Sequence, residues 1–387
     1  MRRPAVALTL ALVAGPALGL AAPAYAGGQS WTVPASASIT INGHGYGHGH
    51  GMSQYGAQGA AKQGLTSTEI AEFYYPGTEW GTAAGRIRVL ISGDTTDDVV
   101  VLAADGLTLR SSAGREVLPD NGATQWRFLG GTVSWFDGTW HKYAVVKGDA
   151  GFSVPGAPVS LVTPSGVTEY RGQVWSRVDG GDPVTVDTLG MASYLRGVVP
   201  LEMPALWEPA AVQAQTIAAR TYAAYERAHP RSAVYDICDT WSCQVYGGAS
   251  AEHPASDAAV TATGRKILTY DGEPAFTQFA SSSGGWTSAG SVPYLKAQAD
   301  PYDAYSGNPV HDWSVTLTDR TLERAWPALG NLRRIVVNSR DGNGDWGGRL
   351  TSITVVGGRG RVTMSGDTFR SKLGLRSTYL TFSVRAR

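Results

Sequence analysis

Glu202 is the one carboxylate in the apolar stretch of residues 194–204, YLRGVVPLEMP, where it lies between Pro200 and Pro204. A carboxylate with few polar neighbours loses hydration, and this desolvation raises its pKa because it favours the protonated form. A carboxylic acid that stays protonated near neutral pH can donate its proton to a leaving oxygen, as cleavage of a glycosidic bond requires. Glu202 is therefore a candidate general acid. The alternative, which the local chemistry alone favours, is a surface glutamate at the entrance of a helix.

The stretch is expected to form a turn before the one long helix that the sequence predicts. That helix has Pro209 in its first turn and continues to about Ala228, before Pro230. A stripe of apolar residues at helical spacing predicts burial along one side. Arg220 lies within this helix, where it could form an ion pair with Glu202 or contact a substrate. A direct pair would lower the pKa of Glu202 and oppose its role as an acid.

Two later segments offer polar groups to a substrate. Gln244 and Tyr246 could orient it, and the alternative for both is hydrogen bonding within the core. Ser282, Ser283 and Gly284 offer hydroxyls and backbone amides, and the alternative there is a tight turn. A serine hydrolase is not predicted, because the sequence around Ser283 lacks a nucleophile elbow.

Glycine alternates with histidine or tyrosine over residues 43–51, GHGYGHGHG, just before the sequence MSQ. His48 is a candidate site residue, and His44 and His50 are candidate solvent-facing neighbours. Their spacing would also permit a metal site. We predict no metal, because a glycine-rich loop is floppy and no acidic ligand lies close in the sequence.

Cys238 and Cys243 are the two cysteines of the chain. In an exported protein, the default interpretation is one disulfide that closes a small loop. The alternative is a zinc site, completed by Asp236, Asp239 and a distant histidine. We predict the disulfide, because two cysteines without a nearby histidine make an incomplete zinc signature.

Residues 1–26 are typical of a secretory signal peptide. Two arginines precede an apolar run over residues 5–20, and a small-x-small cleavage site follows at residues 24–26. The alternative, a membrane anchor, fits less well because the run is short and contains glycine and proline. We therefore expect a secreted, cell-wall-associated protein with no stable membrane insertion after cleavage.

The composition, with 49 Gly, 20 Pro and 10% aromatic residues, is typical of short strands and many turns. Candidate strands follow one another over residues 85–190 and again over residues 310–387. Two short helices are expected earlier, one over residues 53–63 and one from Thr66, which fits a capping box with Glu69. A net charge of zero argues against a nucleic-acid partner. The prediction is a β-rich α+β fold with one long central helix and a few short helices.

Six motifs together resemble the SpoIID/LytB family, also called stage II sporulation protein D, over about residues 40–80 and 170–387. They are GHGHGMSQ at 47–54, YLRGVVPLEMP at 194–204, AQTIAARTY at 214–222, CQVYGG at 243–248, SSSGG at 281–285 and FRSKLGLRS at 369–377, the last resembling a late strand-edge motif. In most members the GHGxGMSQ motif follows the last strand, whereas here it comes first. If the fold is shared, residues 43–77 should pack beside a strand at residues 379–384, as in a circular permutation.

The sequence patterns and the resemblance together predict a domain organisation. The signal peptide occupies residues 1–26, and the Gly-His motif with its short helices, residues 38–80, packs into the SpoIID-like domain. Residues 85–170 form a strand-rich scaffold. Residues 171–387 form the SpoIID-like catalytic domain.

The activity that the resemblance implies is peptidoglycan lytic transglycosylation of denuded glycan strands, in cell-wall remodelling or sporulation, without a cofactor. Glu202 would be the catalytic acid. Candidate substrate-binding residues are Tyr194, Arg220, Gln244, Tyr246, Ser282, Ser283, Gly284, His48, Ser53 and Gln54. The name LytB marks the alternative, a non-catalytic glycan-binding module or an enhancer of a partner N-acetylmuramoyl-L-alanine amidase. A general secreted carbohydrate-binding protein would explain the many tryptophans but not the Glu202 motif.

The single prominent glutamate fits a transglycosylase better than a hydrolase. Hydrolysing glycosidases use two carboxylates, one as acid and one as base or nucleophile. In a lytic transglycosylase one carboxylate protonates the leaving oxygen and then accepts the proton of the muramic C6 hydroxyl, which attacks C1 of its own sugar. Because this nucleophile is intramolecular, its high effective molarity replaces an activated water.

Overall fold

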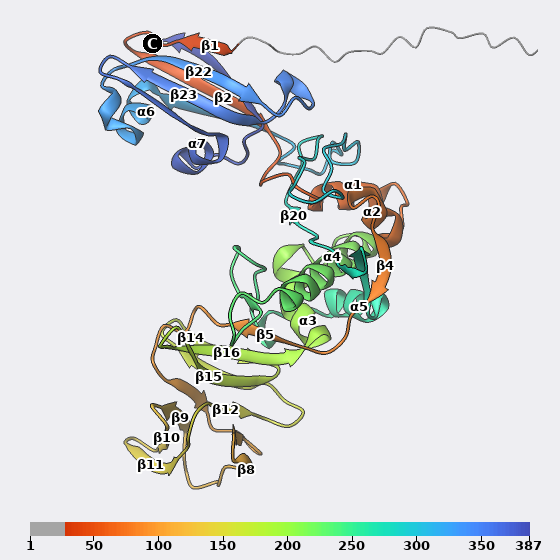
Figure 1. Cartoon of the computed structure of the whole chain (residues 1–387), viewed down its shortest axis with the longest axis vertical. Coiled ribbons are helices and arrows are strands. Elements are labelled where there is room, and N and C mark those ends of the chain that lie inside the picture. The colour runs from red at the N-terminus through yellow and green to blue at the C-terminus, as the bar shows by residue number, and fades with distance from the viewer. Residues whose placement is uncertain (1–27) are drawn as a thin grey trace, which may run out of the picture.

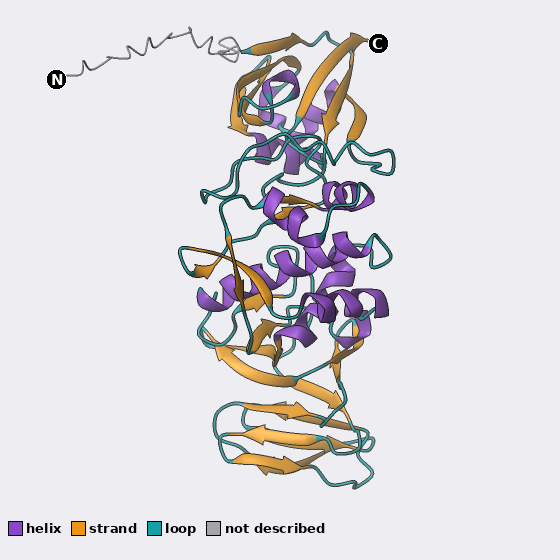
Figure 2. Cartoon of the chain, turned by 90° about the vertical axis from the view of Figure 1, so that its right-hand side faces the viewer, coloured by secondary structure: helices purple, strands orange, loops and turns teal. Residues whose placement is uncertain are grey.

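The structure, a computed structural model, describes residues 28–387, so the predicted signal peptide lies outside the described residues. The molecule is elongated, with strand-rich regions at its two ends and most helices between them (Figures 1 and 2). This arrangement confirms the predicted β-rich α+β class. No helix in the described part of the chain is long and apolar enough to span a membrane.

The centre of the molecule is built around one long helix, α4 (Pro209–Ala228), whose bounds match the predicted helix. The sequence predicted burial along one side, but most of its residues are buried because α1, α2, α3, α5 and β18 surround it. The shorter helices are α1 (Gln54–Lys62), α2 (Ser67–Tyr74), α3 (Met191–Glu202), α5 (Pro254–Thr263), α6 (Asp319–Ala325) and α7 (Gly366–Leu373), with 3-10 turns at Ala249–Ala251, Pro327–Leu329 and Asp345–Gly347. The capping box between Thr66 and Glu69 is present at the start of α2.

Two sheets form the end of the molecule away from the C-terminus (Figure 1), and their strand pairs are antiparallel except for one parallel pair at the edge of the larger sheet. They share one hydrophobic core with the central helices, and Trp126 and Phe152 are among its buried members. The seven-stranded sheet has the order β17 (Ile237–Cys238), β5 (Arg86–Leu90), β16 (Asp182–Gly190), β15 (Gln173–Asp179), β12 (Ala150–Ser153), β7 (Thr108–Ser111) and β8 (Gly114–Val117). The six-stranded sheet has the order β11 (Trp140–Val145), β10 (Thr132–Phe136), β9 (Gln125–Leu129), β6 (Val99–Leu102), β13 (Val159–Thr163) and β14 (Gly166–Tyr170).

The other end is a second hydrophobic core, formed by the first and last described segments of the chain. One sheet has the order β1 (Gln29–Thr32), β22 (Leu332–Arg340), β23 (Leu350–Gly357) and β24 (Arg361–Ser365). A three-stranded sheet has β2 (Ala37–His44) between β21 (Asp312–Thr318) and β25 (Leu380–Ala386). The segment that was expected to be a strand-edge motif, residues 369–377, instead begins within α7.

The Gly-His segment joins the two cores. At its start, β2 pairs Gly43 with Leu380 of β25, and the next backbone amide, of His44, donates to the carbonyl of Tyr379 at 2.8 Å. At its end, β3 (Met52–Ser53) pairs in parallel with β20 (Phe279–Ala280), and α1 and α2 then pack against α4. The last small sheet has the order β19 (Glu273–Pro274), β18 (Lys266–Tyr270) and β4 (Glu79–Thr82). The segment therefore begins beside β25, as the circular permutation predicts, and ends against the central helix.

Candidate functional site

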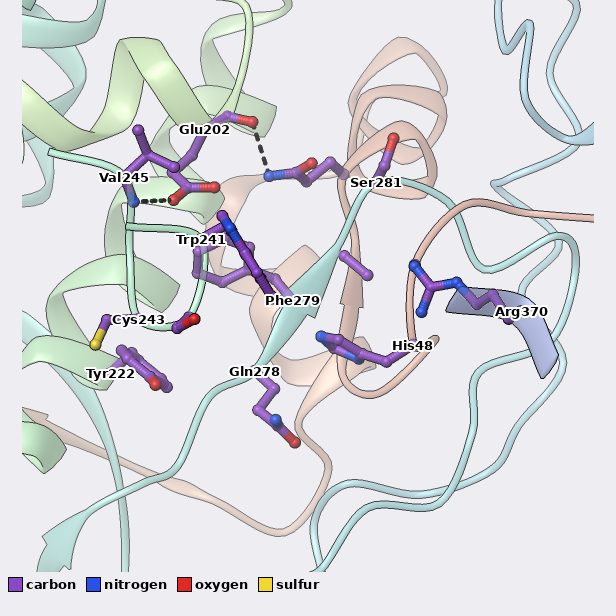
Figure 3. A pocket seen from close by; sticks show the side chains of 14 residues that line it. His48, Glu202, Tyr222, Trp241, Cys243, Val245, Gln278, Phe279, Ser281 and Arg370 are labelled. Carbon is purple, nitrogen blue, oxygen red and sulfur yellow. Dashed lines mark hydrogen bonds between the residues drawn. The ribbon is translucent and has the colours of Figure 1, made fainter. Parts of the chain in front are cut away.

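A cavity of about 560 Å³ lies where the two cores meet, and six separate segments of the chain line it. Figure 3 shows Glu202 and Val245 on one side of this cavity, with His48 and Arg370 on the other. The lining residues are Gly47, His48, Gln54, Glu202, Tyr222, Trp241, Ser242, Cys243, Val245, Gln278, Phe279, Ala280, Ser281 and Arg370. Among them Glu202 is the only carboxylate.

Glu202 is the last residue of helix α3, whereas the sequence predicted a turn. Pro200 lies within the last turn of this helix, so its missing amide removes a single hydrogen bond without breaking the helix. One carboxylate oxygen, Oε1, accepts a hydrogen bond from the backbone amide of Val245 at 2.7 Å. The other oxygen points toward the open side of the cavity (Figure 3).

The environment of Glu202 favours a protonated carboxyl group. Burial raises the pKa of Glu202 above its usual value, and the amide of Val245 opposes this only in part. Arg220, the cation that could have lowered this pKa, does not line the cavity. Its guanidinium is buried and donates to the carbonyl oxygens of Val260 and Lys266 and, at 3.0 Å, to the hydroxyl of Thr263. Arg220 therefore makes no ion pair with Glu202 and lies outside the cavity.

Gln54 connects the N-terminal motif to the end of α3. Its Nε2 donates to the backbone carbonyl of Glu202 at 2.8 Å and lies 3.4 Å from Oε1 of Gln215. Gln54 is also part of the cavity wall, so the GHGxGMSQ motif contributes directly to the Glu202 site. Ser53, its neighbour, caps α1 and donates to Asp303 instead of facing the cavity.

The loop that carries Val245 is held from behind by three buried side chains. Tyr194 donates to Oε1 of Gln244 at 3.0 Å, and Tyr246 donates to Oδ2 of Asp187 at 2.8 Å. None of Tyr194, Gln244 and Tyr246 lines the cavity, so the structure places all three in the core. Gly197 of α3 permits the close approach of this loop, because a Cβ there would lie 2.7 Å from the ring of Tyr246.

A disulfide links Cys238 and Cys243 and closes the loop between them. Trp241 lies within that loop, 88% exposed, and lines the cavity beside Glu202. The sequence interpretation overlooked this residue. An available signal was an isolated tryptophan between two cysteines, since so short a loop has no core in which to bury an indole.

The three residues Ser282, Ser283 and Gly284 do not face the cavity, and their neighbour Ser281 does. They surround two buried carboxylates that the sequence interpretation did not identify. Asp303 receives hydrogen bonds from the side chains of Ser53 and Ser282 and from the backbone amides of Ser283 and Gly284, and its Oδ2 lies 2.7 Å from Nδ1 of His311. Ser283 donates its hydroxyl to Asp300 at 2.7 Å.

These bonds set the charge of the buried pair. Burial alone would raise the pKa of Asp303, but the hydrogen bonds from His311, Ser53 and Ser282 bring it below its usual value. Burial and the nearby charge of Asp303 raise the pKa of Asp300 to about 6. The residues expected to bind sugar here thus stabilise an internal anion.

His48 lines the cavity as a neutral imidazole. Its Nδ1 accepts the backbone amide of His50 at 2.9 Å, and the two rings stack with centroids 5.0 Å apart. Burial, followed by the positive charges of His50, Arg349 and Arg370, lowers the pKa of His48 to about 3. His48 can therefore exchange hydrogen bonds with a substrate at neutral pH without carrying a charge.

Within residues 28–387, no group of three His, Cys, Asp or Glu side chains is gathered closely enough to hold a metal ion. The two cysteine sulfurs bond to each other. His44 lies away from His48, with Nδ1 2.6 Å from Asp312 and its ring stacked on Trp346 at 4.4 Å.

Comparison with known proteins identifies relatives of this part of the chain. A family model described as "Stage II sporulation protein" matches residues 180–270, which include Glu202, α4 and the disulfide loop. An amidase enhancer from Bacillus subtilis (strain 168) is 38% identical over 135 residues, which are 33% of this chain and 17% of the relative. Stage II sporulation protein D of the same strain is 32% identical over 227 residues, 50% of this chain and 60% of the relative. That of Bacillus amyloliquefaciens is 30% identical over 219 residues, again 50% and 60%. The chain thus spans 60% or less of the length of these relatives.

Proposed function

Because this chain belongs to the SpoIID family, we propose that it cleaves peptide-free peptidoglycan strands as a secreted lytic transglycosylase with Glu202 as its single acid and base. The observation that carries this proposal is the carboxyl group of Glu202. It is half-buried with a raised pKa, it has no cationic partner among residues 28–387, and it is the only carboxylate among the lining residues of the cavity. The family and the amidase-enhancer relative support a cell-wall role.

The reaction needs no second acid. The protonated carboxyl of Glu202 donates its proton to the glycosidic oxygen as the bond from C1 of the muramic residue to that oxygen breaks. The C6 hydroxyl of the same residue then attacks C1, and the carboxylate of Glu202 accepts the hydroxyl proton. The products are a 1,6-anhydromuramic end and a free hydroxyl on the departing sugar, and Glu202 returns to its starting state.

The hydrogen bond from Val245 supports both halves of this cycle. A backbone amide only donates, so it holds Oε1 of Glu202 as an acceptor and leaves the proton on the other oxygen. That oxygen points into the cavity (Figure 3). The same amide stabilises the carboxylate after proton transfer, which keeps the pKa from rising so far that Glu202 could no longer release its proton.

The other lining groups suit a sugar chain. Trp241 offers an exposed aromatic face on which a pyranose ring can lie, and Ser281 and Gln278 offer hydrogen-bonding groups for hydroxyl and N-acetyl substituents. Arg370 and neutral His48 provide donors on the opposite wall. The geometry therefore supports a glycan that passes between Trp241 and the Gly-His segment.

Mass spectrometry of peptide-free glycan strands incubated with the protein tests this proposal. We expect anhydromuramic ends with the wild type and none with Glu202→Gln, which keeps the size of the side chain and its acceptor oxygen. Reducing ends would show hydrolysis, which the site with one carboxylate does not explain. Unchanged activity of Glu202→Gln would refute the mechanism.

The second candidate function is enhancement of a cell-wall amidase. The relative that carries the name amidase enhancer favours it. In that case glycan stays intact with the protein alone, and release of stem peptides by an added N-acetylmuramoyl-L-alanine amidase accelerates equally with the wild type and Glu202→Gln.

A further inference from the structure

A second cavity, of about 410 Å³, concentrates positive charge on the seven-stranded sheet. Four arginines line it, Arg86, Arg110, Arg115 and Arg171, and no aspartate or glutamate is among the lining residues. The whole chain has a formal net charge of zero, so this clustering is a local property of the surface.

Three of these four arginines have no ion pair in the described chain, and only Arg171 is paired, with Glu252. Two other arginines of the same sheet are matched differently, because Arg88 pairs with Asp236 and Arg177 pairs with Asp149. These two arginines outside the cavity each have an aspartate partner, whereas the three unpaired arginines inside it do not.

Two of the unpaired arginines also face each other. Arg110 of β7 and Arg115 of β8 are directly opposite in the antiparallel register. Like charges in that position are destabilising unless an anion lies between them. Arg110 donates its Nε to the hydroxyl of Ser153 at 2.6 Å, which orients the guanidinium, and its terminal nitrogens make no hydrogen bond within residues 28–387.

The N-terminus of helix α3 lies at the same cavity. Gly190, its N-cap, and Ser193, in its first turn, are both lining residues, and no side chain caps this end. The first-turn amides and the helix dipole favour an anion there. The buried acid Asp187 lies behind the wall at Gly172, where its Oδ2 already accepts a hydrogen bond from Tyr246.

From these features we propose that this cavity binds a phosphate group carried by an anionic polymer of the cell wall. Guanidinium groups pair with phosphate oxygens through two parallel hydrogen bonds, and several of them around one group neutralise its charge. The cavity is at the start of α3 and Glu202 is at its end, so a helix of 12 residues separates them by about 18 Å. The polymer contact would therefore hold the protein on the wall while the Glu202 cavity stays free for glycan. The wall location rests on the proposed function, but phosphate binding does not.

Isothermal titration at low salt with two probes, inorganic phosphate and an oligomer of glycerol phosphate, tests the proposal. We expect the oligomer to bind the wild type at least tenfold more tightly than the double variant Arg110→Ala/Arg115→Ala. The matched control, Arg320→Ala/Arg324→Ala, removes two exposed arginines from α6 and should bind as the wild type does. A second readout is thermal unfolding, in which the oligomer should raise the Tm of the wild type but not of the double variant.

Three outcomes would count against the proposal. Equal affinity of the wild type and the double variant would overturn the site, and equal loss in the control would show general charge attraction. Binding of inorganic phosphate without the oligomer would overturn the assignment to a polymer. Cleavage of peptide-free glycan should be unchanged in the double variant. If the protein bound the oligomer but cleaved no glycan, the proposed function would be refuted and the phosphate site would stand.

Discussion

Replacing Trp241 by alanine should weaken glycan binding by tens of fold while the fold stays intact. The indole is 88% exposed, so nearly all of its surface is available to a ligand and almost none stabilises the protein. An aromatic side chain of this size can bury roughly 200 Å², and a sugar stacked on one face covers about half of that. At about 25 cal/mol per Å² this contact is worth about 2.5 kcal/mol, or roughly 60-fold in Kd.

The assay is calorimetric titration of peptide-free glycan strands into proteins that carry Glu202→Gln, so that binding is measured without cleavage. Trp241→Phe should recover most of the affinity, because a phenyl ring still offers a flat apolar face. Leu206→Ala is the control, since Leu206 is 82% exposed and lines a different cavity. A Kd within twofold of the parent for Trp241→Ala, or an equal loss for Leu206→Ala, would refute the reasoning.

Four further results are expected. Burial raises the pKa of Glu202, so its ionised form lowers the stability of the fold at neutral pH. Glu202→Gln should therefore unfold at a higher temperature than the wild type. This difference in unfolding temperature should close as the pH falls below 4.5. Burial raises the pKa of Asp187 to about 7, so the wild type should lose stability as the pH rises from about 4 to 7 and Asp187→Asn should not. Over this range the unfolding free energy of the variant should rise relative to the wild type by on the order of 4 kcal/mol, measured by denaturant titrations at several pH values. Reduction of the bond between Cys238 and Cys243 should lower the unfolding free energy by about 2 kcal/mol and slow cleavage. In the variant with serine at both positions, reductant should change neither the unfolding free energy nor the cleavage rate. Because the pKa of His48 is about 3, His48→Gln should leave the shape of the pH–rate profile near pH 6.5 unchanged, and loss of an inflection there would contradict this assignment.

The elements that the sequence predicted well are those with local signals. Helix α4 has a proline in its first turn and no internal glycine, and its bounds match the prediction. Helix α3 was missed because two prolines near its end suggested a turn, although a proline in the last turn removes only one hydrogen bond. Helix α7 was missed because the motif at residues 369–377 was interpreted as the edge of a strand, while its capping residue, Ser365, lies before that motif.

In the candidate site, too, the sequence predicted what local signals determine and missed what depends on contacts between distant segments. Glu202 could be found because its desolvation follows from its apolar neighbours in the sequence. Ser282 and Ser283 were expected to face a sugar, but their partners, Asp300 and Asp303, depend on the folded loop. For Arg220 the sequence left open an ion pair with Glu202 or a substrate contact, while its carbonyl partners come from α5 and β18. Local chemistry thus identifies the acid, and only the packing decides which polar groups remain free for a ligand.

The pairing of the first strands with the last has a consequence for how the protein matures. β2 aligns Ala37 with Ala386 and also pairs with β21, so the second core cannot close until the end of the chain has been made. Strands so distant in the sequence pair slowly during folding, because the chain loses the entropy of closing a long loop before any stabilising contact forms. His48 follows β2 closely, and Arg370 lies shortly before β25. The opposite wall of the Glu202 cavity is therefore assembled last, and a chain whose synthesis is not complete has the acid but not the site.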